Sequence, residues 1–159
     1  MRPDPFDRVC LDANIVVRHF SQEPGGEIAR PIFAAAERDE IEVVISSVIF
    51  LEALGQKPGG EIDEELESKV RKLLENPKLI VVDVDYFVAM TARDLRLRDA
   101  KLKTQWDAIH VATAAEAAAD VFFTFDERIG LDREVRGVWL SKPYLGELAN
   151  EDDLLDMID

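Results

Sequence analysis

Short apolar runs alternate along the chain with segments whose apolar residues recur at helical spacing, and this alternation limits the possible folds most strongly. Strands separated by helices indicate an α/β domain with a mostly parallel sheet. Because the expected strands are almost entirely apolar, we expect helices on both faces of the sheet. The expected strands are 6–11, 42–45, 79–84, 121–124 and 138–140, and the expected helices are 26–38, 47–54, 63–74, 86–98 and 104–118.

Length and charge narrow the class of protein. The 159 residues suit one domain, and 19 basic against 33 acidic residues give a net charge of −14. Such a charge argues against nonspecific coating of nucleic acid, but a nucleic-acid enzyme stays open because divalent ions offset clustered carboxylates. The single cysteine, Cys10, excludes an internal disulfide. With no leader-like start and no apolar run long enough for a membrane, we expect a cytoplasmic protein.

Four carboxylates are expected at one edge of this sheet. Asp12 follows the first strand, and Asp126 follows the strand 121–124. Glu52 lies in the helix that leaves the second strand, and Asp107 lies near the start of the helix that returns to the strand 121–124. In open α/β sheets, sites form outside the carboxyl ends of the strands. The four acids are therefore predicted to converge there.

Helix capping is the alternative explanation for three of these acids. Asp12 or its neighbour Asn14 could cap the next helix, since both residue types are favoured at that position. Thr104 and Asp107 resemble a capping box, and Asp126 could cap the short turn that follows it. Capping and a shared site both remain open for these residues.

Glu52 is harder to explain by local structure. It lies in the segment 48–54, which is apolar nearly all round and therefore predicts a buried helix. An unpaired carboxylate in such a helix costs several kcal/mol unless it is paired or bound to a metal. The alternative is that Glu52 faces solvent or pairs with a basic side chain.

A divalent cation would resolve the repulsion among four crowded acids, which otherwise raise one another's pKa and oppose folding. Mg²⁺ and Mn²⁺ favour carboxylate oxygens, and one or two such ions can activate water and stabilise charge on a transferring phosphoryl group. The two histidines, His19 and His110, fit no zinc motif. His110 shares a helical face with Asp107, although a position in the core explains it better.

Four stretches of the sequence together resemble the PIN-domain ribonucleases, most closely the VapC-type toxins of toxin–antitoxin pairs. They are 11–14, 47–52, 106–114 and 124–126, of which the Asp-Ala-Ile-His-Val-Ala-Thr-Ala run is the most specific. The resemblance implies a three-layer α/β/α sandwich and metal-dependent endonucleolytic cleavage of RNA. It also implies a homodimer, neutralised by an antitoxin that covers the groove of the active site.

The resemblance also implies residue roles. Asp12, Glu52, Asp107 and Asp126 match the catalytic acids that hold Mg²⁺ or Mn²⁺. Asn14 and Thr124 match the accompanying polar positions that orient these acids or a water, a role that metal sites generally need.

The sequence departs from the family pattern at two places. Arg128 stands where many relatives carry a further acid, so that Glu127 substitutes for it or the site holds fewer ions. The acidic segment 146–159 lies outside the PIN-like domain, which we place at 1–145. An exposed, frayed helix explains this tail, but it could also dock a partner or lie over a basic groove as a mimic of RNA.

The most basic window of the chain is the tentative RNA contact. It spans 93–103 and leads directly into the helix that carries Asp107. Basic residues beside a metal site can hold the phosphates on either side of the scissile bond, although an ordinary solvated helix face explains the window equally well. The residues proposed for this contact are Arg93, Arg96, Lys101 and Lys103.

The sequence thus favours a Mg²⁺- or Mn²⁺-dependent endoribonuclease, the toxin of a toxin–antitoxin pair. A catalytically silent PIN fold that binds RNA or a protein is the main alternative. A phosphatase of the haloacid dehalogenase type also places an acid after its first strand, but its second acid would stand where this chain has Asn14. A receiver-like domain gives Glu52 no role.

Overall fold

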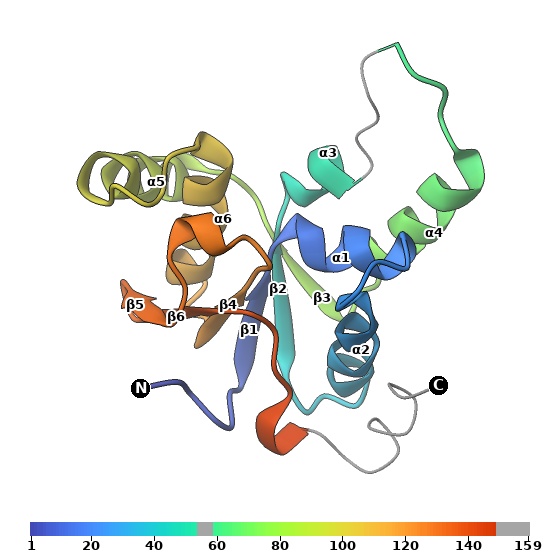
Figure 1. Cartoon of the computed structure of the whole chain (residues 1–159), viewed down its shortest axis with the longest axis horizontal. Helices are drawn as coiled ribbons and strands as arrows, with labels where there is room; N and C mark the ends of the chain where they lie inside the picture. Colours follow the sequence, from blue (N-terminus) through green and yellow to red (C-terminus); the bar gives the residue numbers. More distant parts are fainter. Residues whose placement is uncertain (54–58, 149–159) are drawn as a thin grey trace.

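The structure, a computed structural model, describes residues 1–53 and 59–148 and contains one six-stranded sheet (Figure 1). The strand order is β3-β2-β1-β4-β6-β5, and every neighbouring pair is parallel except β5 with β6. The mostly parallel sheet is therefore confirmed. The strands are β1 (Arg8–Leu11), β2 (Glu42–Ser46), β3 (Leu79–Val82), β4 (Val121–Phe123), β5 (Arg133–Val135) and β6 (Val138–Ser141).

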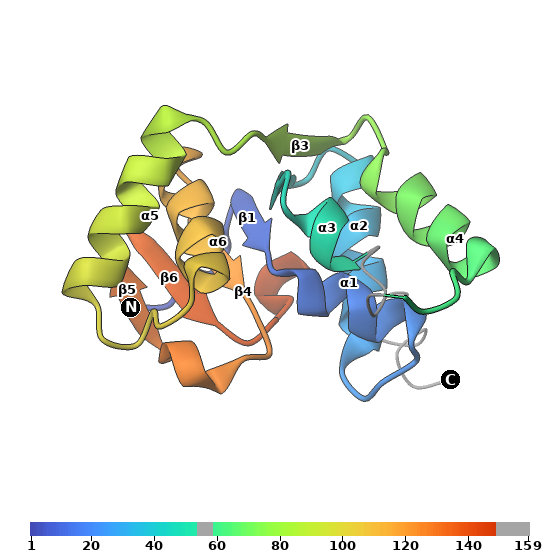
Figure 2. The ribbon, with the colours of Figure 1, turned by 90° about the horizontal axis from the view of Figure 1, so that it is seen from above.

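Helices cover both faces of the sheet, which confirms the three-layer α/β/α sandwich. Figure 2 shows α5 and α6 on one side of the strands and α1 to α4 on the other. The helices are α1 (Ala13–Phe20), α2 (Ala29–Glu37), α3 (Ile49–Ala53), α4 (Glu64–Leu74), α5 (Tyr86–Arg98) and α6 (Gln105–Glu116). Three short 3₁₀ turns complete the described elements, at Gly26–Ile28 (η1), Glu127–Ile129 (η2) and Gly146–Leu148 (η3).

The core has two parts because successive side chains of a strand point to opposite faces. In β1, Val9 and Leu11 pack with residues of α1, α2 and α4, whereas Cys10 packs with residues of α5 and α6. The same alternation places Phe123 of β4 in the first cluster and Phe122 in the second. Burial on both faces explains why these strands are apolar throughout.

Several local expectations were wrong. The helix α1 and the short antiparallel strand β5 were not predicted. The expected burial of the helix around Glu52 holds for Ile49, but Leu51 is 63% exposed, because α3 is a single short turn at the surface. The strand β3 is also less buried than expected, since it forms an edge of the sheet and leaves Ile80 and Val81 partly exposed.

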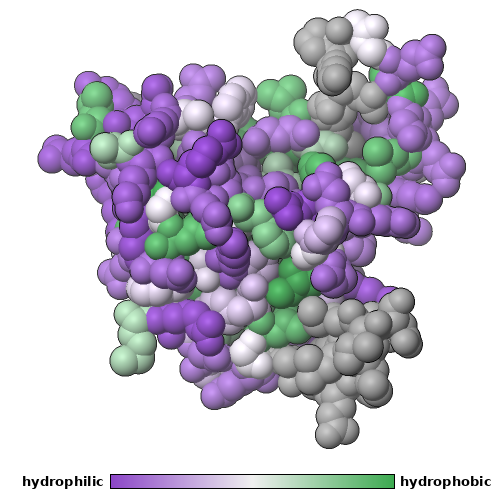
Figure 3. Space-filling view, viewed as in Figure 1, coloured by the Kyte–Doolittle hydropathy of each residue, from purple (hydrophilic) through white to green (hydrophobic). Residues whose placement is uncertain are grey.

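The surface of the molecule is mainly polar. The face drawn in Figure 3 is dominated by hydrophilic residues, with smaller apolar areas between them. Within the part of the chain that the structure describes, none of the helices combines the length and the apolar character that crossing a membrane requires.

The strand order reverses between β1 and β4, and this switch point positions the site. From β1 the chain proceeds to β2 and β3 on one side, and it then returns to build β4 and β6 on the other. Asp12 follows β1 and Thr124 follows β4, and the backbone N–H of Asp12 donates to the carbonyl of Phe123 over 3.0 Å. A crevice outside the strand ends at such a point is the usual place for a ligand in an open α/β sheet.

Candidate active site

Asp12 begins the site, and its side chain does not cap a helix. The residue occupies the N-cap position of α1 with an extended backbone, but its carboxylate accepts no bond from the first turn. Instead, Oδ2 accepts hydrogen bonds from Thr124 Oγ1 at 2.6 Å and from Asn14 Nδ2 at 3.2 Å. The capping explanation is therefore wrong for Asp12, whose partners come from two different segments of the chain.

Asn14 and Thr124 form a polar network around that carboxylate. Thr124 Oγ1 accepts from Asn14 Nδ2 and from the backbone N–H of Asp126, each over 3.0 Å. Asn14 Oδ1 accepts from the backbone N–H of Phe125 over 3.2 Å. Since Thr124 is fully buried, this network fixes the loop after β4 against the start of α1 and occupies Oδ2 of Asp12. The other oxygen, Oδ1, remains for a ligand.

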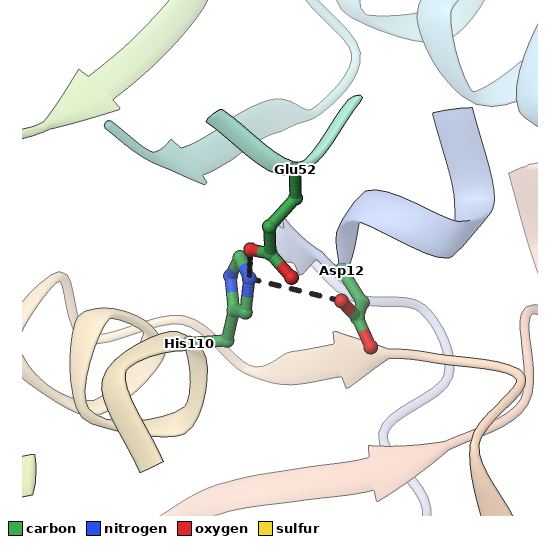
Figure 4. Close-up of side chains that lie close together, drawn as sticks. All are labelled: Asp12, Glu52 and His110. Carbon is green, nitrogen blue, oxygen red and sulfur yellow. Dashed lines mark hydrogen bonds and ion pairs between the residues drawn. The ribbon is translucent and has the colours of Figure 1, made fainter. Parts of the chain in front are cut away.

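Glu52 and His110 complete the inner part of the site (Figure 4). His110 Nε2 lies 2.5 Å from Oε1 of Glu52 and 3.8 Å from Oδ1 of Asp12. Glu52 therefore has a basic partner, and His110 lies both in the core and beside the site. One ligand atom from each of the three residues lies within 4.8 Å of the others.

Burial and neighbouring charges act in opposite directions on the pKa values of Asp12 and His110. For Asp12, burial raises the pKa, and the neighbouring histidine and threonine offset this only in part. For His110, burial on its own would lower the pKa, but the hydrogen bond to Glu52 and the charge of Asp12 outweigh it and raise the pKa above its ordinary value. The protonation of His110 is thus coupled to the two carboxylates beside it.

Asp107 and Asp126 have local partners, as the capping explanation predicted. Thr104 caps α6 by accepting from the backbone N–H of Asp107 at 3.1 Å, and its hydroxyl donates to Asp107 Oδ2 at 2.7 Å. Asp126 caps the turn η2 and accepts from Nε and Nη2 of the Arg128 guanidinium, each over 2.8 Å. That guanidinium holds the pKa of Asp126 below its usual range.

All four predicted acids nevertheless line one open cleft of about 540 Å³. Asp12 and Glu52 belong to the inner group, and Asp107 and Asp126 lie toward its rim with Trp106 and two arginines. The tentative RNA contacts lie elsewhere: Arg93 and Arg96 line a second hollow between α5 and α6, and Lys101 and Lys103 line neither. The arginines of the cleft are Arg18 and Arg128.

Sequence reasoning gave no role to Trp106 and Arg18, which line the cleft, or to His110, which lies next to Asp12 and Glu52. His110 carried a signal, its shared helical face with Asp107, but a position in the core was the better explanation from sequence. Trp106 adjoins Asp107 in the sequence, yet a lone tryptophan has no specific meaning. Arg18 reaches the cleft because its guanidinium lies 4.3 Å from the ring centre of Phe125, a contact between distant segments that no sequence pattern indicates.

The donor set fits a hard divalent cation. Asp12 and Glu52 present carboxylate oxygens, and Nε2 of His110 is engaged with one of those oxygens. Oxygen-rich sites suit Mg²⁺ and Mn²⁺, whereas a zinc site would draw on histidine and cysteine. The only cysteine is buried in the core, where burial raises the pKa of its thiol.

Comparisons with known proteins agree with this geometry. The family model of the PIN domain matches residues 9–133, whereas no curated protein matches the chain. A toxin–antitoxin complex from Klebsiella pneumoniae shares the fold with a TM-score of 0.57 and 21% identity over 82% of this chain and 94% of that one. VapBC2 from Rickettsia felis, bound to promoter DNA, has a TM-score of 0.61 and 18% identity over 85% of this chain and 98% of that one.

A third solved structure is VapC20 from Mycobacterium tuberculosis, a toxin that cleaves the sarcin–ricin loop. It has a TM-score of 0.61 and 13% identity over 80% of this chain and 97% of that one. At these identities the likeness extends to the fold. The family model, however, covers most of the chain and includes all four acids of the cleft. On this evidence, the chain belongs to the PIN domain family.

Proposed function

We propose that this protein is a metal-dependent endoribonuclease that hydrolyses RNA phosphodiesters with Mg²⁺ or Mn²⁺. The observation that carries the proposal is the convergence of Asp12, Glu52, Asp107 and Asp126 on one cleft at the switch point of the sheet. Asp12 and Glu52 would hold the ion, with Asp107 and Asp126 as further ligands from the rim. When bound, the ion supplies a polarised water and charge stabilisation at the phosphoryl group.

The side chains around the acids have separate tasks in this mechanism. Thr124 and Asn14 fix one oxygen of Asp12, so that its second oxygen faces the cleft in one orientation. His110 holds Oε1 of Glu52, which leaves Oε2 of Glu52 to ligate or to accept a proton from water. Such outer partners are worth about 10–100-fold in metal affinity or activity.

The cellular role that we propose is that of a VapC-type toxin, acting on RNA in the cytoplasm and neutralised by an antitoxin protein. Structures of toxin–antitoxin complexes that share the fold support this role. Expression of the wild type in a bacterial host should arrest growth, and Asp12→Asn should not. Normal growth with soluble wild-type protein would contradict the toxin role.

We also propose a homodimer, formed through the surface of β3 and the start of α5. Ile80 and Val81 are partly exposed there, and Tyr86 and Phe87 are 70% and 66% exposed. Core packing does not account for these side chains, and adjacent exposed apolar groups commonly mark an interface. Sedimentation should show a dimer in the wild type and a monomer in Phe87→Lys. A monomeric wild type would exclude the dimer.

The nuclease proposal is tested by cleavage of a mixed RNA pool. Wild type, Asp12→Asn and Asp107→Asn are compared in Mg²⁺, Mn²⁺ or EDTA, with Asp83→Asn as the matched control, an exposed acid outside the cleft. We expect cutting that requires metal, persists in the control and is lost in both site variants. Metal binding and RNA binding without cutting would instead favour the catalytically silent PIN fold.

A further inference from the structure

A second hollow lies beside the cleft, between α5 and α6. Its volume is about 400 Å³, which lies within the usual range for small-molecule pockets. The walls are mainly apolar and include Val84, Ala89, Ala92 and Ile109. None of the four acids lines it. The hollow is therefore a space separate from the cleft.

The two arginines that line this hollow are exceptional in so acidic a chain. Most of the other arginines form ion pairs with carboxylates. Within residues 1–53 and 59–148, Arg93 and Arg96 form none, although the chain carries 33 acidic residues. Arg96 donates only to the backbone carbonyl of Lys103, at 3.5 Å. Both guanidinium groups thus remain free for an anion, and their planar form suits phosphate.

The hollow and the cleft lie on two sides of the same helical turn. Gln105 lines the hollow, whereas the residues on either side of it in the sequence, Thr104 and Trp106, line the cleft with Asp107. Successive residues of a helix point about 100° apart, so the first turn of α6 forms the wall between the two spaces. Trp106 is 37% exposed on the cleft side, where its ring can stack on a base.

We infer that the hollow binds an unpaired nucleotide of the RNA, next to the nucleotides held in the cleft. The base lies among the apolar residues, Gln105 faces its polar edge, and Arg93 and Arg96 contact the flanking phosphates. The apolar walls suit the base of a nucleotide, and the free guanidinium groups at the rim suit its phosphate. Unpaired RNA is the form whose bases can enter such a pocket. This inference rests on the proposed function, because it assumes an RNA substrate.

The test measures binding of a short fluorescein-labelled single-stranded RNA of mixed sequence by anisotropy, in EDTA so that no cutting occurs. Arg93→Gln and Arg96→Gln are compared with Arg98→Gln, a matched control on the same helix whose side chain pairs with Asp94 outside the hollow. We expect each of the first two to weaken binding about tenfold, the range for a charge-assisted hydrogen bond. The control should change it less than twofold.

A second pair of variants tests the place of the base without changing charge. Ala89→Phe fills the hollow, and Met90→Phe places the same ring on the neighbouring exposed position outside it. Ala89→Phe should weaken binding of the RNA several-fold and leave binding of a base-free ribose–phosphate strand unchanged, and Met90→Phe should affect neither.

Two outcomes would overturn the inference. Arginine variants that bind like Arg98→Gln exclude phosphate contacts at the hollow. An Ala89→Phe variant that binds RNA normally but loses its dimer in sedimentation assigns the hollow to a second copy of the chain. If the wild type cuts RNA with metal while every variant of the hollow binds normally, the subsite alone fails. If the wild type neither binds nor cuts RNA, the proposed function fails with it.

Discussion

The inner and outer acids of the cleft differ in where their partners come from. The side chain of Asp12 has contacts from Asn14, from the loop after β4 and from α6. Asp107 and Asp126, at the rim, are each bonded to a side chain only a few residues away, Thr104 and Arg128 respectively. Apart from the bond that Asn14 donates, the contacts of Asp12 thus exist only in the assembled fold, whereas the outer ones can form within a single turn.

Asp126 and Asp12 differ in whether a cation compensates the charge of the carboxylate. Asp126 is paired with a guanidinium that lowers its pKa, and burial raises the pKa of Asp12 despite the nearby His110. A buried carboxylate of this kind opposes folding when it is ionised. An ion in the cleft would therefore stabilise Asp12 and its inner neighbours more than it stabilises Asp126 at the rim.

The largest effect is expected at Asp12. Asp12→Asn should reduce metal-dependent cleavage by more than about 100-fold, since even the outer partners of a metal ligand are worth 10–100-fold. The same change should raise the Tm of the metal-free protein, because it removes a buried charge and leaves the bonding partners Thr124 and Asn14 in place. Cleavage assays and thermal unfolding in EDTA measure the two effects.

Asp107→Asn is the matched variant at the rim. It should also lose cleavage, but the metal-free Tm should not rise, because Asp107 is bonded to the exposed Thr104 cap. A lower Tm for Asp12→Asn in EDTA would contradict this. It would show that the ionised carboxylate of Asp12 stabilises the metal-free fold.

The pH dependence of stability is the next largest effect. The pKa of His110 is raised above its ordinary 6.5, so its stabilising contribution is complete below that pH and is lost as the pH rises through the folded value. The raised pKa of Asp12 has the same sign, because this acid also holds its proton more tightly in the folded state, but its effect begins near the ordinary value of 3.8. We expect the metal-free free energy of unfolding to fall as the pH rises from about 6 to about 8.

Urea unfolding in EDTA across this range measures the slope. His110→Gln retains a donor for Glu52 but cannot be protonated, and it should flatten the curve. Mg²⁺ should stabilise the wild type more at the upper end of the range than at the lower. A slope that is the same in wild type and His110→Gln would mean that another group causes it.

The caps at the rim of the cleft and most strands of the sheet could be predicted from sequence, because the sequence patterns that indicate them are local. The Thr104–Asp107 cap and the Asp126 cap each lie within four residues, and the apolar runs of β1, β2 and β4 are buried on both faces. The strand β5 was not predicted, because it has three residues and pairs only with β6 at the sheet edge. Such short edge strands carry almost no periodic signal.

The inner group was predictable only in part. Topology placed Asp12 and Glu52 at one edge, but the contact between Glu52 and His110 joins residues 58 positions apart on two helices. A histidine in an apolar helix reads as a core residue, and only the packing of α6 against β1 and β2 shows that its ring reaches the carboxylates. The helix α1 was not predicted, since it has only eight residues and directly follows the site.

A smaller effect is expected from the cap of α6. Thr104→Val removes the hydroxyl that accepts from Asp107 N–H and donates to Asp107 Oδ2. Loss of an N-cap costs about 1 kcal/mol, and chemical unfolding in EDTA measures it. Thr91→Val is the control, because its hydroxyl bonds to Glu116 on a neighbouring helix and caps nothing. Equal losses in the two variants would show that the cap contributes no more than an ordinary surface hydrogen bond.

The smallest effect is expected at Arg128. Its replacement would leave Asp126 without a counter-charge, as Asp12 is without a full one. Arg128→Gln removes the guanidinium that pairs with Asp126 and leaves that carboxylate with only its bond from the backbone N–H of residue 128. Because the Arg128 side chain is 88% exposed, the Tm should change little, whereas Mn²⁺ affinity measured by calorimetry should rise several-fold.

Arg98→Gln breaks a comparable exposed pair, with Asp94, away from the cleft, and should leave Mn²⁺ affinity unchanged. If Arg128→Gln behaves like this control, Asp126 lies outside the reach of the ion, and metal binding depends on the inner acids and Asp107. If Arg128→Gln binds a second equivalent of Mn²⁺, the guanidinium of the wild type occupies the place of a second ion. Arg128 then limits the wild-type site to one metal ion.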